Sequence, residues 1–185
     1  MVFQFKVILF IVASLGIAWL SRTSLRDFRS HGFYRFFAWE AILVLILLNL
    51  DYWFYEPLSS HQIVSWLLLI VSLFLVIHGV QLLRKKGKPD SQRYDPALIG
   101  LEKTTELVTV GVYRYIRHPL YSSLLFLAWG AFVKHFSWAG VFLAVIATFF
   151  LTVTAKMEEV ENTRFFGAAY QSYMKKTKLF VPFLF

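Results

Sequence analysis

The sequence predicts an all-α integral membrane protein that forms a single domain, residues 1–185, with about five transmembrane helices. Of its residues, 58% are hydrophobic and 19% aromatic, while only 16% are charged. Soluble domains carry about a quarter charged residues, and a chain this short cannot enclose so many apolar side chains in one aqueous core. Lipid must therefore be part of its solvent. The apolar residues also gather in long runs, as membrane-spanning helices require.

Five apolar runs define the expected helices, at residues 2–20, 33–50, 63–83, 120–133 and 138–155. The first run lacks the basic start and the small-residue cleavage site of a signal peptide, so we expect it to be retained as a helix. The third and fifth runs contain no Asp, Glu, Lys or Arg, and each is long enough to span about 30 Å of hydrocarbon. The first three runs make up an N-terminal part, residues 1–83.

The fourth run has only 14 residues, which is short for a perpendicular span. Pro119 precedes it, at the place where a helix accepts proline in its first turn. Only a short polar stretch beginning at Lys134 separates it from the fifth run. We therefore expect the last two transmembrane segments to form a tight helical hairpin.

A further helix is expected in the C-terminal tail. Apolar and aromatic side chains recur there at i, i+3, i+4, i+7 and i+8, which is the spacing of one helical stripe; they are Phe166, Ala169, Tyr170, Tyr173 and Met174. Such a stripe followed by lysines is typical of an amphipathic helix lying at the membrane interface.

The basic residues predict the orientation in the membrane. Four lie in residues 21–35, eight in residues 84–117 and five from residue 156 onwards, and the remaining two are Lys6 and Lys134. Segments rich in Lys and Arg remain in the cytoplasm. We therefore expect the N-terminus outside and the C-terminus in the cytoplasm, in a bacterial inner membrane or an endomembrane.

The composition also excludes several classes of function. A net charge of +8 is compatible with nucleic-acid binding, but the basic residues flank apolar runs instead of covering a soluble fold, so no nucleic-acid partner is expected. There is no cysteine, and the five histidines are scattered, so no metal site is expected. Membrane lipids are the expected surroundings.

Two polar clusters flank the predicted hairpin and meet at its open end if the hairpin forms. One contains Arg117 and His118, and the other contains Glu158 and Glu159. One interpretation is an interfacial belt, in which arginine and tyrosine reach the headgroups and the glutamates pair with them. The alternative is a site for a zwitterionic cofactor, because the helix beginning at Pro119 offers N–H groups to a carboxylate and nearby tyrosines can lie over a cation.

The order of residues favours the second interpretation. The string TVGVYRYIRHPLY at residues 109–121 is followed by Glu158-Glu159, by FGAAYQSY at residues 166–173 and by Pro182. This order resembles the superfamily of isoprenylcysteine carboxyl methyltransferases and phospholipid methyltransferases. The resemblance covers residues 84–185, the expected cofactor-binding and catalytic region, whereas the N-terminal helices match only in being apolar.

The resemblance implies an integral membrane methyltransferase that holds S-adenosyl-L-methionine on the cytosolic side and meets its acceptor in the membrane. Carried over by motif, the cofactor-binding residues are Thr105, Glu106, Leu107, Val108, Tyr113, His118, Pro119, Leu120, Tyr121 and Glu158. Arg117 is expected to orient an anionic acceptor or the cofactor carboxylate. Glu159 is the candidate base if the acceptor is an amine or a thiol, whereas a carboxylate acceptor needs none.

The acceptor half matches the superfamily less closely. The eukaryotic prenylcysteine enzymes carry a substrate-binding arginine where this chain has Thr154, and the usual leucine after the paired glutamates is Asn162. We therefore expect a lipid-like or lipidated methyl acceptor without naming it. One alternative is an NADPH-dependent membrane reductase of the sterol reductase type, although Leu120 and Ser123 depart from the reductase motif. A non-catalytic membrane subunit is the other.

Overall fold

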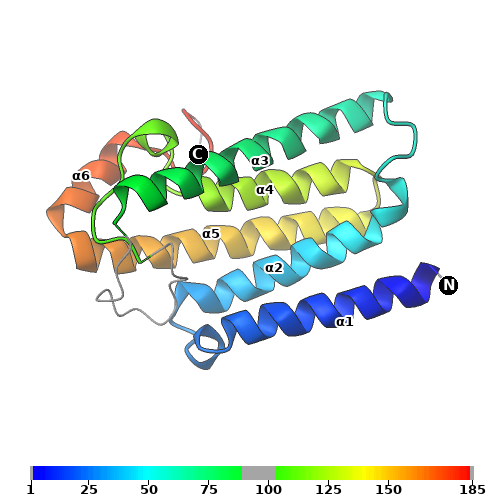
Figure 1. Ribbon diagram of the computed structural model, residues 1–185, viewed down its shortest axis with the longest axis horizontal. Coiled ribbons are helices and arrows are strands. Elements are labelled where there is room, and N and C mark those ends of the chain that lie inside the picture. The colour runs from blue at the N-terminus through cyan, green and yellow to red at the C-terminus, as the bar shows by residue number, and fades with distance from the viewer. Residues whose placement is uncertain (1, 89–102, 184–185) are drawn as a thin grey trace.

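The computed structural model describes residues 2–88 and 103–183, and every regular element within them is a helix (Figure 1). Arg93, one of the eight basic residues of the central loop, lies outside the described residues. In chain order the elements are α1 (Val2–Ser21), η1 (Ser24–Arg26), α2 (His31–Leu48), η2 (Leu50–Tyr52), α3 (Ser60–Lys86), η3 (Gly111–Arg114), α4 (Pro119–Val133), α5 (Trp138–Phe166) and α6 (Ala168–Lys176). The all-α prediction is confirmed.

Four helices are long and apolar enough to cross a membrane: α1, α2, α3 and α5. The fourth predicted segment forms α4, whose 15 residues fall short of that length. The described residues therefore supply four candidate spans and one shorter apolar helix, where the sequence predicted about five spans. α5 continues beyond the predicted end at residue 155 to Phe166. Glu158 and Glu159 consequently stand on a rigid helix and not in a loose tail.

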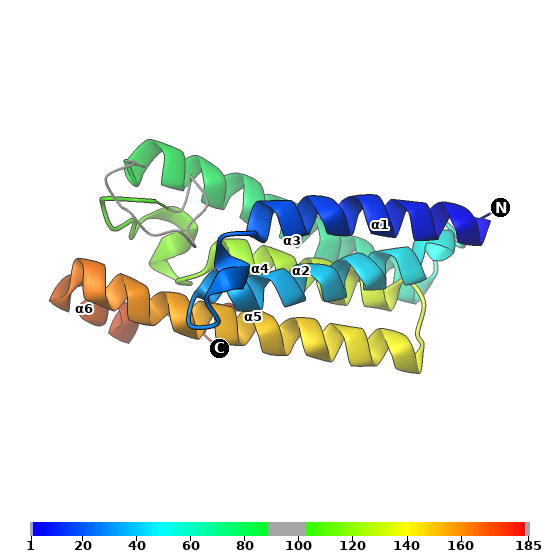
Figure 2. The same cartoon turned by 90° about the horizontal axis from the view of Figure 1, so that it is seen from below.

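The helices pack as two antiparallel pairs plus an outer helix (Figures 1 and 2). α4 lies along α3, and α5 lies along α2, while α1 packs on the outer side of α2. α4 ends at Val133, and Ser137 caps the start of α5 by accepting a hydrogen bond from Gly140 N over 3.1 Å. The connection between the two helices is therefore short. α4 and α5 are thus neighbours in a hairpin, although each makes its most extensive contacts with an earlier helix.

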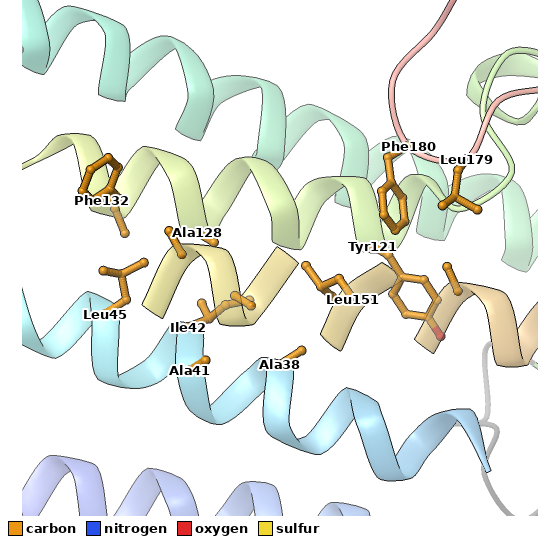
Figure 3. Packing of buried hydrophobic residues seen from close by; sticks show 14 residues of the cluster. Ala38, Ala41, Ile42, Leu45, Tyr121, Ala128, Phe132, Leu151, Leu179 and Phe180 are labelled. Atoms are coloured by element: carbon orange, nitrogen blue, oxygen red, sulfur yellow. The ribbon is translucent and has the colours of Figure 1, made fainter. Parts of the chain in front are cut away.

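Small residues allow this close packing. Seven alanines are buried where α2, α4 and α5 meet: Ala38, Ala41, Ala128, Ala131, Ala144, Ala147 and Ala155. Small side chains bring helix backbones close enough for dispersion contacts to hold a bundle in lipid, where the hydrophobic effect does not drive helices together. Figure 3 shows larger core residues, Leu45 and Leu151 among them, filling the space between these alanines.

The outward faces of the bundle are apolar. Large hydrophobic side chains such as Leu15 on α1, Ile70 on α3 and Phe149 on α5 are more than half exposed. Contiguous apolar surface of this kind is unfavourable in water and suits a lipid environment. The chain therefore has the build of a membrane protein.

The residues after α6 close the end of the bundle that carries the two polar clusters. Arg117 N donates to Lys178 O over 2.8 Å, and Lys178 N donates to Tyr115 O over 2.9 Å. The Ser122 hydroxyl donates to Phe180 O over 2.8 Å. Figure 3 shows the Phe180 ring packed beside Tyr121 at the start of α4. The C-terminal segment, residues 177–180, therefore fixes the position of the α4 N-terminus.

Candidate functional site

A cavity with about 580 Å³ of empty space opens at the end of the bundle where α6 lies. Its wall is built by the end of α3, the loop before η3, the start of α4, the end of α5, and α6. The lining residues are Leu83, Thr104, Leu107, Val108, Tyr113, Arg117, His118, Pro119, Leu120, Tyr121, Glu158, Asn162, Phe166, Tyr170 and Tyr173. Part of this space is open to solvent, so the cavity is a cleft at the end of the bundle and not a closed chamber.

The start of α4 forms one wall. Pro119 occupies the first turn, where its missing N–H costs nothing because first-turn N–H groups have no intrahelical acceptor. α3 approaches this point closely at Gly79, where an added Cβ would lie 3.1 Å from Leu120 Cδ2 and 3.7 Å from the Tyr113 hydroxyl. Pro119, Leu120 and Tyr121 all line the cavity, so the positive end of the α4 dipole faces it.

Arg117 joins three segments around the cavity. Its Nε donates to Glu159 Oε1 over 2.6 Å, and its Nη1 donates to Met174 O over 3.2 Å and also to Thr177 O. The second oxygen of Glu159 accepts from Lys156 Nζ over 3.0 Å. Arg117 lines the cavity, whereas Glu159 lies behind it with both oxygens engaged. The two residues expected to be catalytic thus form a buried ion pair with each other.

His118 lies beside both glutamates. Its Nδ1 is 3.8 Å from Glu158 Oε2, and its Nε2 is 3.9 Å from Glu159 Oε1, distances that permit electrostatic attraction but exceed a hydrogen bond. Nε2 is buried and has no hydrogen-bond partner among residues 2–88 and 103–183. Asn162 Nδ2 donates to Glu158 Oε1 over 3.3 Å. Buried polar atoms normally have a hydrogen-bond partner. This ring nitrogen can therefore form a hydrogen bond with a polar ligand in the cavity.

α6 closes the cavity with two tyrosines. Tyr170 and Tyr173 are both buried, and the Tyr173 hydroxyl donates to Tyr113 O over 2.6 Å. Burial, with a smaller contribution from the Glu158 carboxylate, raises the pKa of Tyr170, and burial also raises the pKa of Tyr173. Both hydroxyls therefore stay protonated and act as donors. The apolar stripe expected at the membrane interface is turned inward at these two positions.

The structure brings most of the predicted site residues together. Leu107, Val108, Tyr113, the residues from His118 to Tyr121, and Glu158 all line the cavity. Thr105 and Glu106 do not: their backbone N–H groups donate to Gly87 O, and Glu106 pairs with Lys88. These two residues hold the loop against the end of α3.

Sequence reasoning missed six lining residues: Leu83, Thr104, Asn162, Phe166, Tyr170 and Tyr173. A signal for the last three was present, because they form the FGAAYQSY motif. Thr104 and Leu83 carry no recognisable pattern. Within the described residues, no three His, Cys, Asp or Glu side chains are grouped as a metal site requires.

Comparison with known proteins identifies the family. Residues 60–169 match the phospholipid methyltransferase family, and because this is more than half of the chain, the chain belongs to that family. The resemblance seen in the sequence is therefore confirmed. No solved structure shows a significant match to the chain.

Individual relatives are also methyltransferases. The chain is similar to Methanethiol S-methyltransferase of Pseudomonas deceptionensis, with 26% identity over 65% of this chain and 43% of that protein. It is similar to Protein-S-isoprenylcysteine O-methyltransferase B of Arabidopsis thaliana, with 31% identity over 71% of this chain and 66% of that protein. The Probable protein-S-isoprenylcysteine O-methyltransferase of Oryza sativa subsp. indica is 31% identical over 64% of this chain and 63% of its own length. The matches thus span less than half of the bacterial enzyme and about two thirds of the plant ones.

Proposed function

We propose that this protein is an integral membrane methyltransferase that takes its methyl group from S-adenosyl-L-methionine and transfers it to a membrane-associated acceptor. The observation that carries this proposal is the cavity in which the start of α4 and Glu158 of α5 face each other. When bound, S-adenosyl-L-methionine supplies an electrophilic methyl group on a cationic sulfur. The residues that line the cavity must therefore bind a cationic sulfur, a carboxylate and a nucleoside at the same time.

The cavity residues fit such a molecule. The α4 N-terminus and Arg117 suit its carboxylate, while Glu158 and the faces of Tyr113 and Tyr121 suit the cation and the nucleoside. The buried Nε2 of His118, 3.9 Å from Glu159 Oε1, can also bind a polar group of the ligand. Thr105 and Glu106, which lie outside the lining, support the loop in this proposal.

Arg117 and Glu159 position the site in this mechanism. Arg117 already donates to Glu159 and to two backbone carbonyls. It therefore fixes the positions of α4, α5 and the C-terminal segment relative to one another. Both oxygens of Glu159 are occupied, which makes it a poor base, and alignment of the reacting atoms is the main contribution expected from the protein.

The acceptor is proposed to be lipid-like or lipidated. An apolar chain stays in the bilayer because each buried CH₂ contributes about 0.8 kcal/mol, so an enzyme with this build meets it there. Thr154, where prenylcysteine enzymes carry an arginine, is buried, and its hydroxyl donates to Phe150 O over 2.7 Å. This position offers no cation to an acceptor carboxylate, so the reacting group is a carboxylate, amine or thiol recognised in another way.

The orientation follows from the basic residues. Every basic segment of the sequence prediction begins or ends at the cavity end of the bundle (Figure 1). The remaining two basic residues belong to the opposite end, because Lys6 pairs with Asp51 of the connection between α2 and α3, and Lys134 follows the last residue of α4. We therefore place the cavity in the cytoplasm, with the N-terminus outside.

Calorimetry of the purified chain in detergent tests the cofactor. S-adenosylhomocysteine is expected to bind, and NADPH is not. Absence of binding by the first ligand, or tight binding by the second, overturns the proposal; the second result points instead to a membrane reductase. A screen of carboxylate, amine and thiol lipids with labelled cofactor then identifies the acceptor.

A further inference from the structure

The start of α2 carries a buried histidine and a buried arginine, to which the sequence prediction gave no role in the cofactor site. His31 is fully buried, and Arg35, one turn further along the same helix, is 3% exposed. Placing cationic groups inside a protein is costly unless opposite charges or acceptors surround them. α2 packs along α5, so the acidic residues of α5 are the groups to consider.

Glu161 of α5 holds the first residue of α2 with both of its oxygens. Oε2 lies 2.5 Å from His31 Nδ1, and Oε1 accepts from His31 N over 3.3 Å. Because a carboxylate only accepts, Nδ1 carries the proton and Nε2 is the ring position that faces away from Glu161. The carboxylate also neutralises the positive end of the α2 dipole. This geometry fixes the imidazole against α5.

Glu158 lies three residues before Glu161 and therefore on the same face of α5. α2 and α5 run antiparallel (Figure 1), and His31 is bonded to Glu161, so Arg35, one turn after His31, comes to the level of Glu158, one turn before Glu161. Favourable electrostatic interactions of Glu158 with His118, His31 and Arg35 agree with this arrangement. The other cations of this region, Arg117 and Lys156, are bonded to Glu159. Glu158 is the one carboxylate among the described residues that lines the cavity, and the basic side chains of α2 lie on its other side.

We infer that His31 and Arg35 are positioning residues that hold Glu158 in its ionised, cavity-facing arrangement. The N-terminal part of the chain then completes the cofactor site instead of serving only as a membrane anchor. This inference rests on the proposed function, because it assigns Glu158 to the binding of S-adenosyl-L-methionine.

The test is a double-mutant cycle on S-adenosylhomocysteine affinity, measured by calorimetry with the full chain in detergent. Arg35→Met and His31→Leu are each expected to weaken binding about tenfold in the natural background. In a Glu158→Gln background the same changes are expected to alter affinity less than about twofold, because the charge they act on is gone. His31→Asn, which retains a donor near the Nδ1 position but carries no charge, is expected to lose affinity as His31→Leu does.

Glu40→Gln is the matched control. Glu40 also lies on α2, but its Oε1 accepts from the Ser14 hydroxyl of α1 over 3.0 Å, so this change acts on the contact between α2 and α1. Binding is expected to be unchanged in this variant. Arg35→Gln, which retains polarity without charge, replaces Arg35→Met if the latter does not fold, with the same expected loss.

The outcomes separate the two proposals. If the unaltered protein fails to bind S-adenosylhomocysteine, the proposed function and this inference fall together. If Glu158→Gln weakens binding but the α2 variants bind normally, only the inference is overturned. Equal losses in both backgrounds also overturn it, since they show that α2 acts through general packing.

Discussion

Arg117 Nε and Glu159 Oε1 lie 2.6 Å apart although 42 positions separate the two residues in the chain. This bond joins the turn before α4 to the middle of the polar part of α5. Through its Nη1 donors, the same guanidinium also reaches the end of α6 and the segment after it. Three walls of the cavity therefore converge on one side chain.

Replacement of Arg117 is expected to damage both stability and binding. Arg117→Met removes the donor to Glu159 Oε1 and to the carbonyls of Met174 and Thr177, while Glu159 keeps its bond to Lys156. The loss of stability is therefore expected to be smaller than the about 3–5 kcal/mol of a fully broken buried ion pair. Thermal unfolding and S-adenosylhomocysteine calorimetry measure the two effects. The neighbouring Arg114→Met is the control, because Arg114 is exposed and should be neutral. Wild-type affinity in a folded Arg117→Met variant would show that the cavity does not depend on this pair.

His118→Ala and Glu158→Ala test the polar half of the cavity. Hydrogen bonds to charged groups contribute about 1.5–3 kcal/mol, so each change is expected to weaken S-adenosylhomocysteine binding by roughly tenfold or more without unfolding the protein. His61→Ala is the control, because His61 lies at the opposite end, near the Ser59 hydroxyl. Normal affinity in both variants removes His118 and Glu158 from the site.

The close approach of α3 and α4 predicts a contrast between two glycines. Gly79→Val places methyl groups where Leu120 already stands at 3.1 Å from an added Cβ, and overpacking of this kind costs about 1–3 kcal/mol. We expect a lower melting temperature and weaker S-adenosylhomocysteine binding. Gly16→Val on α1 should change neither, because nothing lies within 4 Å of an added Cβ there. Similar behaviour of the two variants would contradict the packing of α3 on α4.

Lys134 allows the two ends of the bundle to be tested separately. Its ammonium is buried 3.2 Å from the centre of the Trp66 ring and donates to Gln62 Oε1 over 2.9 Å, and burial lowers the pKa of Lys134. Lys134→Met leaves the Gln62 oxygen unsatisfied, at a cost of about 1–3 kcal/mol. The melting temperature should fall while S-adenosylhomocysteine affinity is retained. An exposed control, Lys85→Met, should leave both unchanged; a loss of affinity in Lys134→Met would mean that the ends are coupled.

The sequence was sufficient to predict that the helices exist, because apolar runs can be read directly from it. It also predicted that the two polar clusters meet, because they flank a hairpin with a short connection. It could not show that α5 continues to Phe166, since the change from apolar to charged residues at Lys156 marks the end of the hydrophobic run and not of the helix. Nor could it assign His31 to Glu161, which lies 130 positions away. Thr105 and Glu106 were assigned to the cofactor site by motif. Whether they line the cavity depends on the hydrogen bonds of their backbone N–H groups to Gly87 O, which the motif does not reveal.

The dependence of α4 on residues 177–180 sets an order of events during synthesis. The helices α1 to α5 end at Phe166, whereas the backbone partners of Arg117 and Ser122 are Lys178 and Phe180, which are made after all five helices. Until then the cavity lacks the contacts that hold the α4 N-terminus in place. We therefore expect the cavity to take its final form after α1 to α5 have been made, once residues 177–180 have paired with the start of α4.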